Sequence, residues 1–431
     1  MLNYARFLTP VAKAREPSPI RALQPLMAIP GMISLGGGLP NPTTFPFASI
    51  DVTLDSGDKV HLQGPELAAS LQYTLTAGFP QMTDWINSYI SRFHRPQYRD
   101  WTTCVTTGSQ DALTKAFDML LTDKDCMIVD NPTYPGALSS LKPIGCRLVG
   151  IETDDFGMIP EELEKNLQLL RNENVLPKAI YTTPIGQNPA GTTLPLARKQ
   201  KIYEICSRYD ILILEDDPYY FLVLEEQDKD PLFPFASNTQ LCSPPASFMS
   251  MDVDGRVLRF DSLSKVLSSG IRIGWVSGPK PLVERINLHM QANELHTCSL
   301  SQCITAALLR QWGDDGLSNH IARIQGLYRS RRDAFFKSLD THLSGLVHCA
   351  KPVAGMFAWM RLNGIEDSSS LIQNEARERK VLAVPGSAFL PDPSRKSSWV
   401  RASFSIASDG DMDEALRRLA ECVKLAQNVQ Q

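Results

Sequence analysis

The chain has 431 residues, with 43 basic and 47 acidic side chains, which gives a formal net charge of −4. At about 150 residues per domain, this length predicts two or three structural units with ample material for a buried core. The hydrophobic share of 43% and the charged share of 21% argue against intrinsic disorder and against a nucleic-acid binder that relies on a bulk basic surface. No apolar run reaches about 18 residues, so the sequence predicts no transmembrane helix.

The nine cysteines are an odd number and include no C-x-x-C pair, so we expect reduced thiols and an intracellular compartment, either the cytoplasm or the mitochondrial matrix. No cluster of cysteines and histidines has the spacing of metal ligands, and no metal site is expected. The motifs H-E-x-x-H, G-x-S-x-G, G-x-x-x-x-G-K and G-x-G-x-x-G are absent. The absence of these motifs argues against zinc proteases, esterases with a nucleophile elbow, P-loop enzymes and dinucleotide dehydrogenases.

The first thirty residues are basic, and Glu16 is their one acidic residue. This composition is typical of a mitochondrial presequence, but Pro10, Pro17 and Pro19 would interrupt a long amphipathic helix. A mobile arm of the mature protein explains the segment at least as well, so both interpretations stay open. The basic residues of the segment are Arg6, Lys13, Arg15 and Arg21.

Residues 100 to 280 alternate short apolar strands with helical patterns, which indicates a mainly parallel sheet with helices on both faces. Ligands of such sheets gather at the carboxyl ends of the strands. After residue 320, long helices alternate with short strands and predict a smaller α+β domain. The expected strands are 104–107, 126–130, 178–183, 211–215, 257–261, 271–277, 357–362 and 399–404. The expected helices are 135–142, 160–171, 195–209, 279–293, 320–343, 367–379, 411–427 and one after residue 107 with the apolar face Ala112, Leu113, Ala116, Phe117, Leu120 and Leu121.

The stretch Thr107-Gly108-Ser109-Gln110 lies at an expected strand-to-helix turn. A helix N-terminus presents free N–H groups and the positive end of the helix dipole, so this turn suits a phosphate group. The simpler interpretation is a serine that caps the helix after a tight turn.

Three acids, Glu215, Asp216 and Asp217, follow the apolar strand ILIL. Carboxylates at the end of a buried strand repel one another and are costly to desolvate without a cation. A protonated heterocyclic nitrogen would supply that cation for one of them. A solvated turn with an aspartate cap is an equally good explanation.

Lys265 follows another expected strand, between small hydroxyl residues and ahead of Arg272. A lysine amine can be held neutral or bonded to an aldehyde. Ser262, Ser264 and Arg272 would hold a phosphate beside it. Taken alone, a lysine is far more often a surface charge.

Asn188 begins the turn Asn-Pro-Ala-Gly after the expected strand AIYTT. Asn-Pro commonly starts a turn, but the amide could also donate to a ligand oxygen. One cofactor accounts for all four groups: pyridoxal 5′-phosphate needs a lysine for its aldehyde, an acid for its pyridine nitrogen and a cup for its phosphate.

The order G-S-Q, P-x-Y, N-P-x-G, D-x-P-Y, S-x-S-K and R-I-G resembles the fold-type I, class I/II aminotransferase family. The likeness runs from the N-terminus to about residue 425. Within the family, the chain resembles the kynurenine/α-aminoadipate aminotransferases through more specific stretches. These are "NYARF", "PSPIR", "SLGGGLPNP", "FPF", "EDDPYYFL", "SMDVDGRV", "SSGIRIG", "GPKPLVER" and "VRASFS".

The resemblance implies an α/β fold of the pyridoxal-phosphate-dependent fold type I, with a mainly parallel seven-stranded sheet in the large domain. The large domain would span 46–315 and the small α+β domain 316–431, while 1–45 would form an N-terminal arm and part of the small domain. The resemblance also implies an obligate homodimer with active sites at the subunit interface, and neither nucleic acid nor membrane as a partner.

The implied activity is transamination of L-kynurenine and/or L-2-aminoadipate, within a broad amino-acid range, with 2-oxoglutarate or another 2-oxo acid as acceptor. Lys265 would bond the cofactor and move the substrate proton, and Asp216 would hold the pyridinium proton. The implied phosphate cup is Ser109, Gln110, Ser262, Ser264 and Arg272, with Tyr73 from the neighbouring subunit. The implied ring contacts are Tyr134, Asn188 and Tyr219. The implied substrate contacts are Arg21, Gly38, Leu39, Tyr73, Tyr134, Asn188 and Arg401, of which Arg401 would grip the α-carboxylate.

Two departures from the family pattern, Asn131 before P-x-Y and the segment 222–247, bear on substrate range rather than on reaction type. A broad aromatic or branched-chain aminotransferase is the alternative enzyme, with β-lyase chemistry as a side activity. A transcription regulator with an aminotransferase-like domain is a third possibility. It needs a helix-turn-helix domain ahead of "SLGGG", and only about 33 residues precede that stretch.

Overall fold

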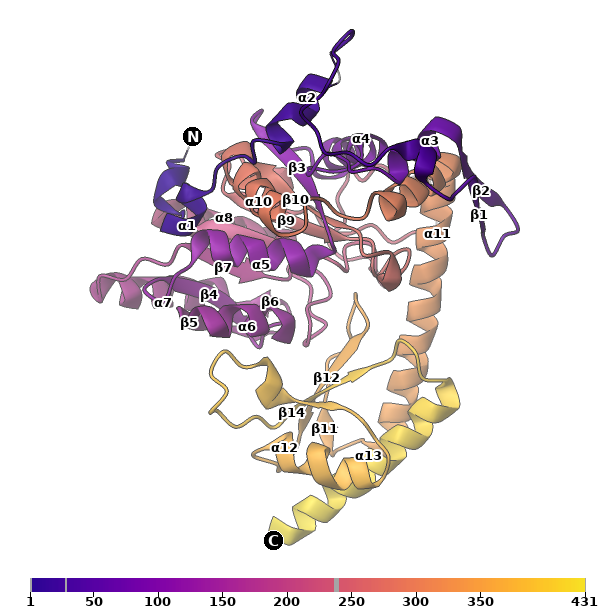
Figure 1. Cartoon of the computed structure of the whole chain (residues 1–431). Coiled ribbons are helices and arrows are strands. Elements are labelled where there is room, and N and C mark those ends of the chain that lie inside the picture. Colours follow the sequence, from indigo (N-terminus) through magenta and orange to yellow (C-terminus); the bar gives the residue numbers. More distant parts are fainter. Residues whose placement is uncertain (1, 28, 236–239, 431) are drawn as a thin grey trace. The chain divides into compact units, whose positions relative to one another are not determined.

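The computed structural model describes residues 2–27, 29–235 and 240–430. The chain divides into two compact units, each built from two separate stretches: residues 1–122 with 249–317, and residues 123–248 with 318–431. We call them the first and the second unit and describe each by itself (Figure 1). Within the described residues, no helix has both the length and the apolar character that a membrane span requires.

Three strands form the sheet of the first unit, and the central one, β10, is antiparallel to both β3 and β9. Side chains of β9 and β10 are buried along their whole length. The helices α5 and α10 pack side by side against this sheet (Figure 1). The strands are β3 (Trp101–Thr106), β9 (Val257–Ser262) and β10 (Gly274–Pro279). The helices are α1 (Pro10–Ala14), α2 (Gln24–Met27), α3 (Gly64–Ser70), α4 (Pro80–Tyr89), α5 (Ser109–Leu120) and α10 (Lys280–Asn293).

Helix α5 positions the loop that precedes it because its apolar face is buried. The predicted face of Ala112, Leu113, Ala116, Phe117, Leu120 and Leu121 is confirmed, since each of these side chains is at most 4% exposed. Burial of that many apolar groups fixes the helix on the sheet, at roughly 25 cal/mol for each Å² removed from water. The first residues of α5 are therefore held rigidly at the end of β3.

Five strands of the second unit continue in the order β8-β7-β4-β5-β6, and the pairs β7–β8, β4–β7 and β4–β5 are parallel. Their carboxyl ends lead into loops at one edge, where parallel sheets hold ligands. The strands are β4 (Cys126–Asn131), β5 (Arg147–Asp154), β6 (Gly157–Met158), β7 (Ala179–Thr182) and β8 (Leu212–Asp216). The helices are α6 (Pro135–Leu141), α7 (Pro160–Asn172) and α8 (Leu196–Tyr209).

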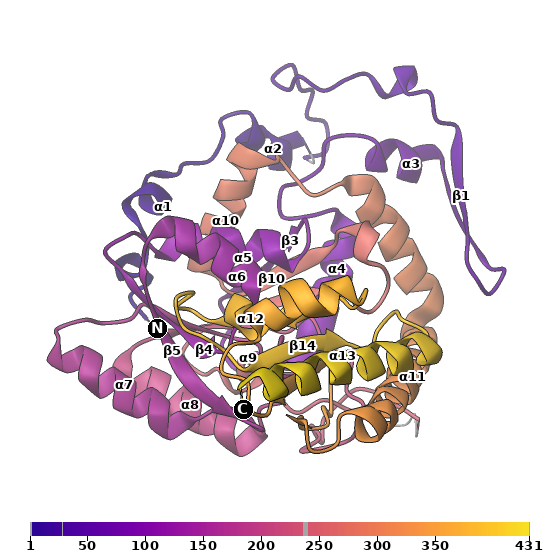
Figure 2. The same cartoon turned by 90° about the horizontal axis from the view of Figure 1, so that it is seen from below.

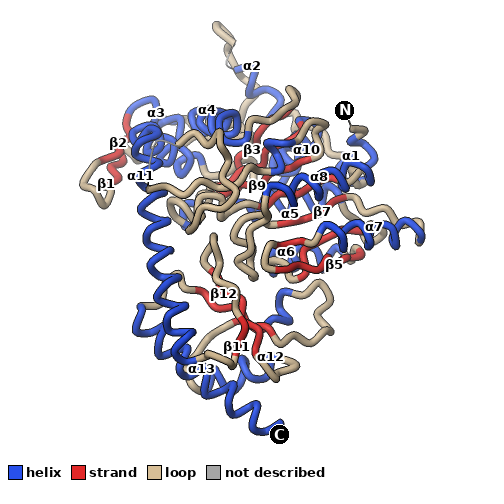
Figure 3. Tube along the Cα trace, turned by 180° about the vertical axis from the view of Figure 1, so that it is seen from behind, coloured by secondary structure: helices blue, strands red, loops and turns tan. Residues whose placement is uncertain are grey.

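The second unit also contains a small antiparallel sheet in the order β11-β12-β14-β13. Its core includes residues from β12, β14, α13 and the C-terminal part of α11. Figure 2 shows α13 running along this sheet, and Figure 3 shows its strands in red beside α11. The strands are β11 (Val347–His348), β12 (Phe357–Leu362), β13 (Val384–Pro385) and β14 (Trp399–Ser403). The helices are α12 (Ser368–Ser370) and α13 (Asp409–Gln430).

The predicted fold class, a mainly parallel sheet with a smaller α+β part, is confirmed. The first unit contributes three strands and the second five, which makes eight rather than the predicted seven because the two-residue β6 adds an edge strand. The predicted domain boundaries 1–45, 46–315 and 316–431 stay a prediction.

Some elements differ from those expected. Helix α11 (Ser299–His342) begins about twenty residues before the expected helix, with a break at Gly313, where φ is 56°. The strand β5 and the hairpin of β1 (Ser49–Thr53) and β2 (Lys59–Gln63) were not predicted. All but one residue of β5, and every residue of β1, are exposed or only partly buried, so the apolar signal of both strands is weak. The short α9 (Phe248–Met251) was not predicted either.

Candidate functional site

The expected phosphate loop connects β3 to α5 in the first unit. Gly108 precedes the helix with φ at 84°, a backbone conformation that glycine adopts readily. A Cβ at this position would also collide with the Arg272 guanidinium. Gly108 has no side chain to cap α5, and the first N–H groups of an α-helix have no partner within the helix. Ser109 and Gln110 are the first two residues of the helix, as predicted.

The loop between β9 and β10 brings the other predicted phosphate ligands together. Ser262 Oγ accepts a hydrogen bond from the Ser264 amide at 3.1 Å, and Arg272 Nη1 lies 3.5 Å from Ser264 Oγ. Arg272 Nη2 donates to the Thr107 carbonyl at 3.0 Å, which ties this loop to the phosphate loop. Gly274 pairs with Ser262 across the sheet, and a Cβ there would lie 2.5 Å from the Ser109 amide nitrogen. Ser262, Ser264 and Arg272 therefore lie beside the phosphate loop, close to the Thr107 carbonyl and the Ser109 amide.

Lys265 lies on the same loop, which hydrogen bonds from the Val266 and Leu267 amides to the Leu263 carbonyl hold in a turn. Its side chain is partly buried, and among the described residues it has no hydrogen-bond or ion-pair partner. Burial, and to a smaller extent the charge of Arg272, lowers the pKa of the Lys265 amine. A lysine in this state is suited to form a covalent bond with an aldehyde.

The N-terminal arm places Arg21 against Tyr73. The guanidinium carbon lies 5.8 Å from the centre of the Tyr73 ring, and Nη1 donates to the Thr74 carbonyl at 2.8 Å. Tyr73 is 48% exposed, and its ring meets that of His296 edge to face. Gly38 and Leu39 are both exposed. The structure thus brings Arg21 and Tyr73 together and leaves Gly38 and Leu39 open to solvent.

The acids at the end of β8 belong to the second unit. Asp216 is 3% exposed, and its Oδ2 accepts a hydrogen bond from the Tyr181 hydroxyl at 2.7 Å. Burial first, and then the charge of Asp216, raises the pKa of Tyr181 well above its usual value. Tyr181 therefore remains a donor that keeps Asp216 oriented. Asp217 is buried too, at 1% exposed, so burial alone does not tell the two aspartates apart.

Arg401 is central to the small sheet, because β14 pairs with β12 on one side and with β13 on the other. Its Nη1 donates to Asn188 Oδ1 at 2.9 Å. The guanidinium lies 4.5 Å from the centre of the Phe357 ring and 5.1 Å from that of Phe389. Among the described residues Arg401 has no carboxylate partner, and its buried Nε has no hydrogen bond. The guanidinium of Arg401 thus has an unpaired N–H group, which a carboxylate ligand could accept from.

Two tyrosines complete the second set. Tyr219 is 5% exposed and meets Phe357 edge to face, and burial followed by the charge of Asp216 raises its pKa. Tyr134 precedes α6, with its ring folded so close to Gly136 that a Cβ there would collide with it. The Tyr219 phenol therefore stays protonated near neutral pH and can donate a hydrogen bond.

The predicted site residues thus form two sets. The first unit holds Ser109, Gln110, Ser262, Ser264, Lys265 and Arg272, with Arg21 and Tyr73 as a separate pair. The second unit holds Tyr134, Asn188, Asp216, Tyr219 and Arg401. The prediction missed Tyr181, because a tyrosine inside the apolar strand AIYTT resembles an ordinary core residue. The signal available was that β7 and β8 are consecutive strands, which are usually neighbours in a sheet.

The donor set fits one kind of cofactor. Amides, hydroxyls and Arg272 suit a phosphate, Lys265 suits an aldehyde, and Asp216 suits a protonated ring nitrogen. The glycines at 108 and 274 leave room where a side chain would block the loop. These observations fit pyridoxal 5′-phosphate.

Comparisons with known proteins agree with this chemistry. The sequence profile of the family "Aminotransferase class I and II" matches residues 62–419. The rat "Kynurenine/alpha-aminoadipate aminotransferase, mitochondrial" is 42% identical over 98% of this chain and 99% of its own. A crystal structure of "the aromatic aminotransferase Aro9" from Candida albicans superposes with a TM-score of 0.87 at 26% identity, covering 100% of this chain and 99% of that one.

A second solved structure contains the cofactor in its aminated form. It is the Pyrococcus horikoshii kynurenine aminotransferase in complex with PMP. This protein is 29% identical to our chain, the TM-score is 0.76, and the match covers 98% of each chain. The family resemblance and the cofactor that the sequence predicted are thereby confirmed. The chain belongs to the class I and II aminotransferases and is a pyridoxal-phosphate-dependent enzyme.

Proposed function

We propose that the enzyme transaminates L-kynurenine and/or L-2-aminoadipate, within a broad amino-acid range, with 2-oxoglutarate or another 2-oxo acid as acceptor. The name of the rat relative supports this substrate class. The environment of Arg401 supports an amino-acid or oxo-acid substrate. Arg401 is partly buried, faces two aromatic rings and has an Nε without a partner in the described residues. A planar guanidinium binds a carboxylate through two parallel hydrogen bonds.

In the first unit, the proposed role of Ser109, Gln110, Ser262, Ser264 and Arg272 is to hold the phosphate. Pyridoxal 5′-phosphate supplies an aldehyde that accepts the amino group and a ring that withdraws electrons from the substrate Cα. Lys265 would hold the cofactor through its aldehyde between turnovers. Because burial lowers its pKa, the Lys265 amine is suited to take the proton from the substrate Cα.

In the second unit, the proposed role of Asp216 is to hold the proton on the pyridine nitrogen, with Tyr181 fixing the carboxylate. Tyr219 and Asn188 would donate to the phenolic oxygen of the ring. Tyr134 would stack on the ring. Because Asn188 Oδ1 accepts from Arg401, the amide nitrogen of Asn188 is the atom that would donate to the cofactor.

The proposed contact to the substrate side chain is Arg21, with Gly38 and Leu39 lining the pocket. Arg21 rests on Tyr73 and on a backbone carbonyl. A side-chain carboxylate such as that of 2-aminoadipate would form a charge-assisted pair with the Arg21 guanidinium.

We also propose that the enzyme is a homodimer. Between residues 26 and 47, large apolar side chains are exposed to solvent. Exposed apolar side chains that lie close together are typical of an interface, and a second copy of the chain would cover them. They are Leu26 (48%), Ile29 (47%), Met32 (48%), Ile33 (87%), Leu35 (98%), Leu39 (40%) and Phe47 (57%). In such a dimer Tyr73 would reach the phosphate of the neighbouring subunit.

A mixing experiment tests the shared site. Homodimers of Tyr73→Ala and of Lys265→Ala should each be nearly inactive. If each site takes Tyr73 from one subunit and Lys265 from the other, mixed dimers contain one intact site and regain activity on mixing. No recovery, in samples shown by mass spectrometry to have exchanged subunits, would contradict the shared site.

The proposed compartment is the mitochondrial matrix or the cytoplasm. The word "mitochondrial" in the name of the rat relative and the basic first thirty residues support the matrix. A fluorescent protein fused to the C-terminus, with and without residues 1–25, distinguishes the two compartments.

A broad aromatic aminotransferase is a second candidate, and the Candida albicans structure with its high TM-score favours it. A screen of the purified enzyme decides between them. Kynurenine, 2-aminoadipate, phenylalanine, tyrosine and leucine are compared as donors by kcat/KM, with 2-oxoglutarate as acceptor. Our proposal expects the first two to lead. If the aromatic or branched-chain donors lead by tenfold or more, the second candidate replaces it.

A further inference from the structure

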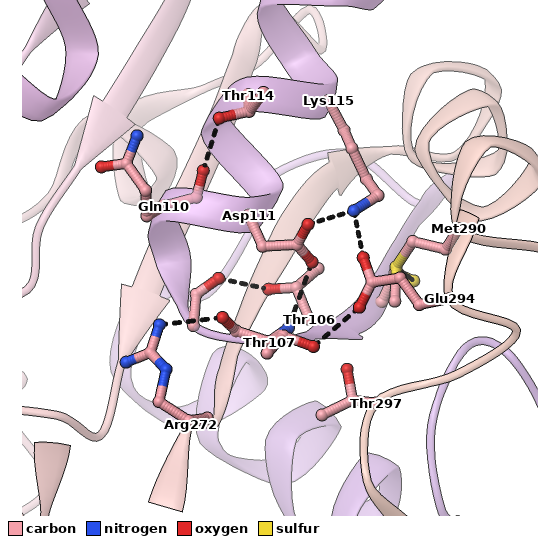
Figure 4. A network of polar contacts seen from close by, with 12 residues as sticks. Thr106, Thr107, Gln110, Asp111, Thr114, Lys115, Arg272, Met290, Glu294 and Thr297 are labelled. Atoms are coloured by element: carbon pink, nitrogen blue, oxygen red, sulfur yellow. Dashed lines mark hydrogen bonds and ion pairs between the residues drawn. The ribbon is translucent and has the colours of Figure 1, made fainter. Parts of the chain in front are cut away.

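A buried cluster of charges lies behind the phosphate loop, on the opposite side of Thr107 from Arg272 (Figure 4). Lys115 is 3% exposed and bonds through Nζ to both Asp111 and Glu294. The two carboxylates are themselves mostly buried, at 18% and 22% exposed. We call these three residues the Lys115 cluster. Asp111 and Lys115 are one turn apart on α5, whereas Glu294 follows α10, so the cluster joins two helices of the first unit.

The Lys115 cluster is connected directly to the phosphate loop. Asp111 Oδ2 accepts from the Thr107 amide at 3.1 Å, and Glu294 Oε2 accepts from the Thr107 hydroxyl at 2.7 Å. Arg272 donates to the carbonyl of the same residue at 3.0 Å. All three polar groups of Thr107 are therefore bonded to charged side chains. Bonds of this kind are about twice as strong as those between neutral groups, and together they fix the Thr107–Gly108 peptide.

The orientation of that peptide decides where the phosphate donors point. Gly108 has φ at 84° and could adopt many other conformations in an unrestrained loop. The next residues, Ser109 and Gln110, begin α5, where the N–H groups have no partner within the helix. A loop that is held before the ligand arrives loses less entropy on binding than one that must be ordered by it.

The charge balance explains why a lysine is needed there. Asp111 and Glu294 are two acids behind a loop that binds an anion, and without a cation they would repel each other and the phosphate. Burial raises the pKa of Asp111, whereas hydrogen bonds from Lys115 and Thr107 outweigh burial and lower the pKa of Glu294. Lys115 therefore compensates the charge that Glu294 retains, in a site where water screens little.

We propose that the Lys115 cluster is a positioning device for the phosphate of the cofactor: it contacts no ligand atom, and it preorganises the Thr107–Gly108 turn for a phosphate monoester. The proposal rests on the phosphate-binding role assigned above to the loop. It predicts that the cluster stabilises the complex with pyridoxal 5′-phosphate but has little effect on pyridoxal, which lacks the phosphate. A cluster that only stabilised the fold would affect both ligands equally.

The experiment measures binding of both ligands to the cofactor-free enzyme by absorbance titration, for the wild type and four variants. Lys115→Met removes the cation and keeps the length of the side chain. Lys115→Met combined with Glu294→Gln restores the charge balance. Thr107→Val removes only the hydroxyl bond to Glu294. Lys199→Met is the matched control, because Lys199 is also fully buried but lies in the second unit, where it donates to the Ala246 carbonyl.

We expect Lys115→Met to weaken pyridoxal 5′-phosphate binding by about 10- to 150-fold, the range for losing a hydrogen bond to a charged group, and to change pyridoxal binding by less than about threefold. The charge-balanced double variant should recover part of this loss. Thr107→Val should show a smaller loss of the same selectivity, which keeps the proposal testable if Lys115→Met does not fold. Lys199→Met should show no selectivity between the two ligands.

Three results would overturn the proposal or its premise. Equal weakening of both ligands in Lys115→Met and Thr107→Val makes the cluster a general structural feature. Unchanged affinity for pyridoxal 5′-phosphate in both variants removes its role altogether. If the wild type itself does not prefer pyridoxal 5′-phosphate over pyridoxal, the phosphate-binding role of the loop fails, and the proposal fails with it.

Discussion

The two units hold their site residues by different means. In the first unit, charged groups and backbone amides converge, with Arg272 and the Lys115 cluster fixing Thr107. In the second unit the partners are buried phenols and a guanidinium between aromatic rings, and burial raises the pKa of Tyr181 and Tyr219. The difference teaches that the residues of the first unit suit an anion, whereas those of the second unit suit the control of protons, and we call them the anion-binding half and the proton-controlling half of the proposed site.

The largest effect should come from Lys265 in the anion-binding half. Lys265→Ala removes the covalent attachment and the proton carrier, and general acid–base catalysis alone contributes about 10²- to 10⁴-fold. We therefore expect kcat for any donor to fall by at least about 10³-fold with the fold retained. Borohydride reduction of the wild type should fix the cofactor on the peptide that contains Lys265. An adduct on a different lysine would contradict the assignment. Lys280→Ala, at an exposed lysine, is the control.

The proton-controlling half is challenged by comparing two buried neighbours. Asp216→Asn cannot keep the pyridine nitrogen protonated, since an amide has no charge, and we expect kcat to fall by about 10²-fold or more. Asp217→Asn should change kcat by less than about tenfold, because the D-x-P-Y spacing and the bond to Tyr181 both single out Asp216. Steady-state kinetics of both variants decide this, and similar losses would refute the choice.

In the proposed site, Arg21 would add a contact to the substrate side chain. Arg21→Ala should lower kcat/KM for 2-aminoadipate by about 10- to 150-fold, the cost of a charge-assisted bond, and affect kynurenine far less. The absorbance of the bound cofactor should not change. Removal of residues 1–25 should have the same selective effect. If that truncation leaves both donors unaffected, the arm is a targeting segment only.

The smallest predicted effect concerns Asp130, fully buried at the end of β4 in the second unit. Its oxygens accept from Thr182 Oγ1 at 3.2 Å and from the Thr183 amide at 3.3 Å, and burial raises its pKa from near 4 to about 7. Since the folded pKa is the higher one, the stabilisation is complete below pH 4 and is lost as the pH rises through 7. The Tm of the wild type relative to Asp130→Asn should therefore fall by several degrees between pH 5 and pH 8. A constant difference would contradict the raised pKa.

Much of the fold could be predicted because it depends on local patterns. The apolar strands at 126–130, 257–261 and 357–362 agree with β4, β9 and β12 to within one residue. The strand β5 was missed because all but one of its residues are exposed or only partly buried, so its apolar alternation is weak. The break at Gly313 hid the first part of α11, since a single glycine gives little sign of a kink.

The site divides in the same way. Motif order led to Lys265, Asp216 and Arg401, because each is the chemical group that the cofactor or substrate requires. It could not reveal Tyr181 or Glu294, whose partners are distant in sequence: Tyr181 bonds Asp216 from another strand, and Glu294 is brought to Lys115 by the packing of α10 on α5. Such supporting residues carry no motif of their own, and only the folded chain identifies them.

The first unit is built from two stretches of chain that are separated by residues 123–248. During synthesis, Thr107 leaves the ribosome well before Arg272 and Glu294, and at about 5–20 residues per second the delay is on the order of ten seconds. Until then the turn at Gly108 lacks two of its three anchors. With the role proposed for this turn, the cofactor would bind only after the second stretch of the first unit has been synthesised.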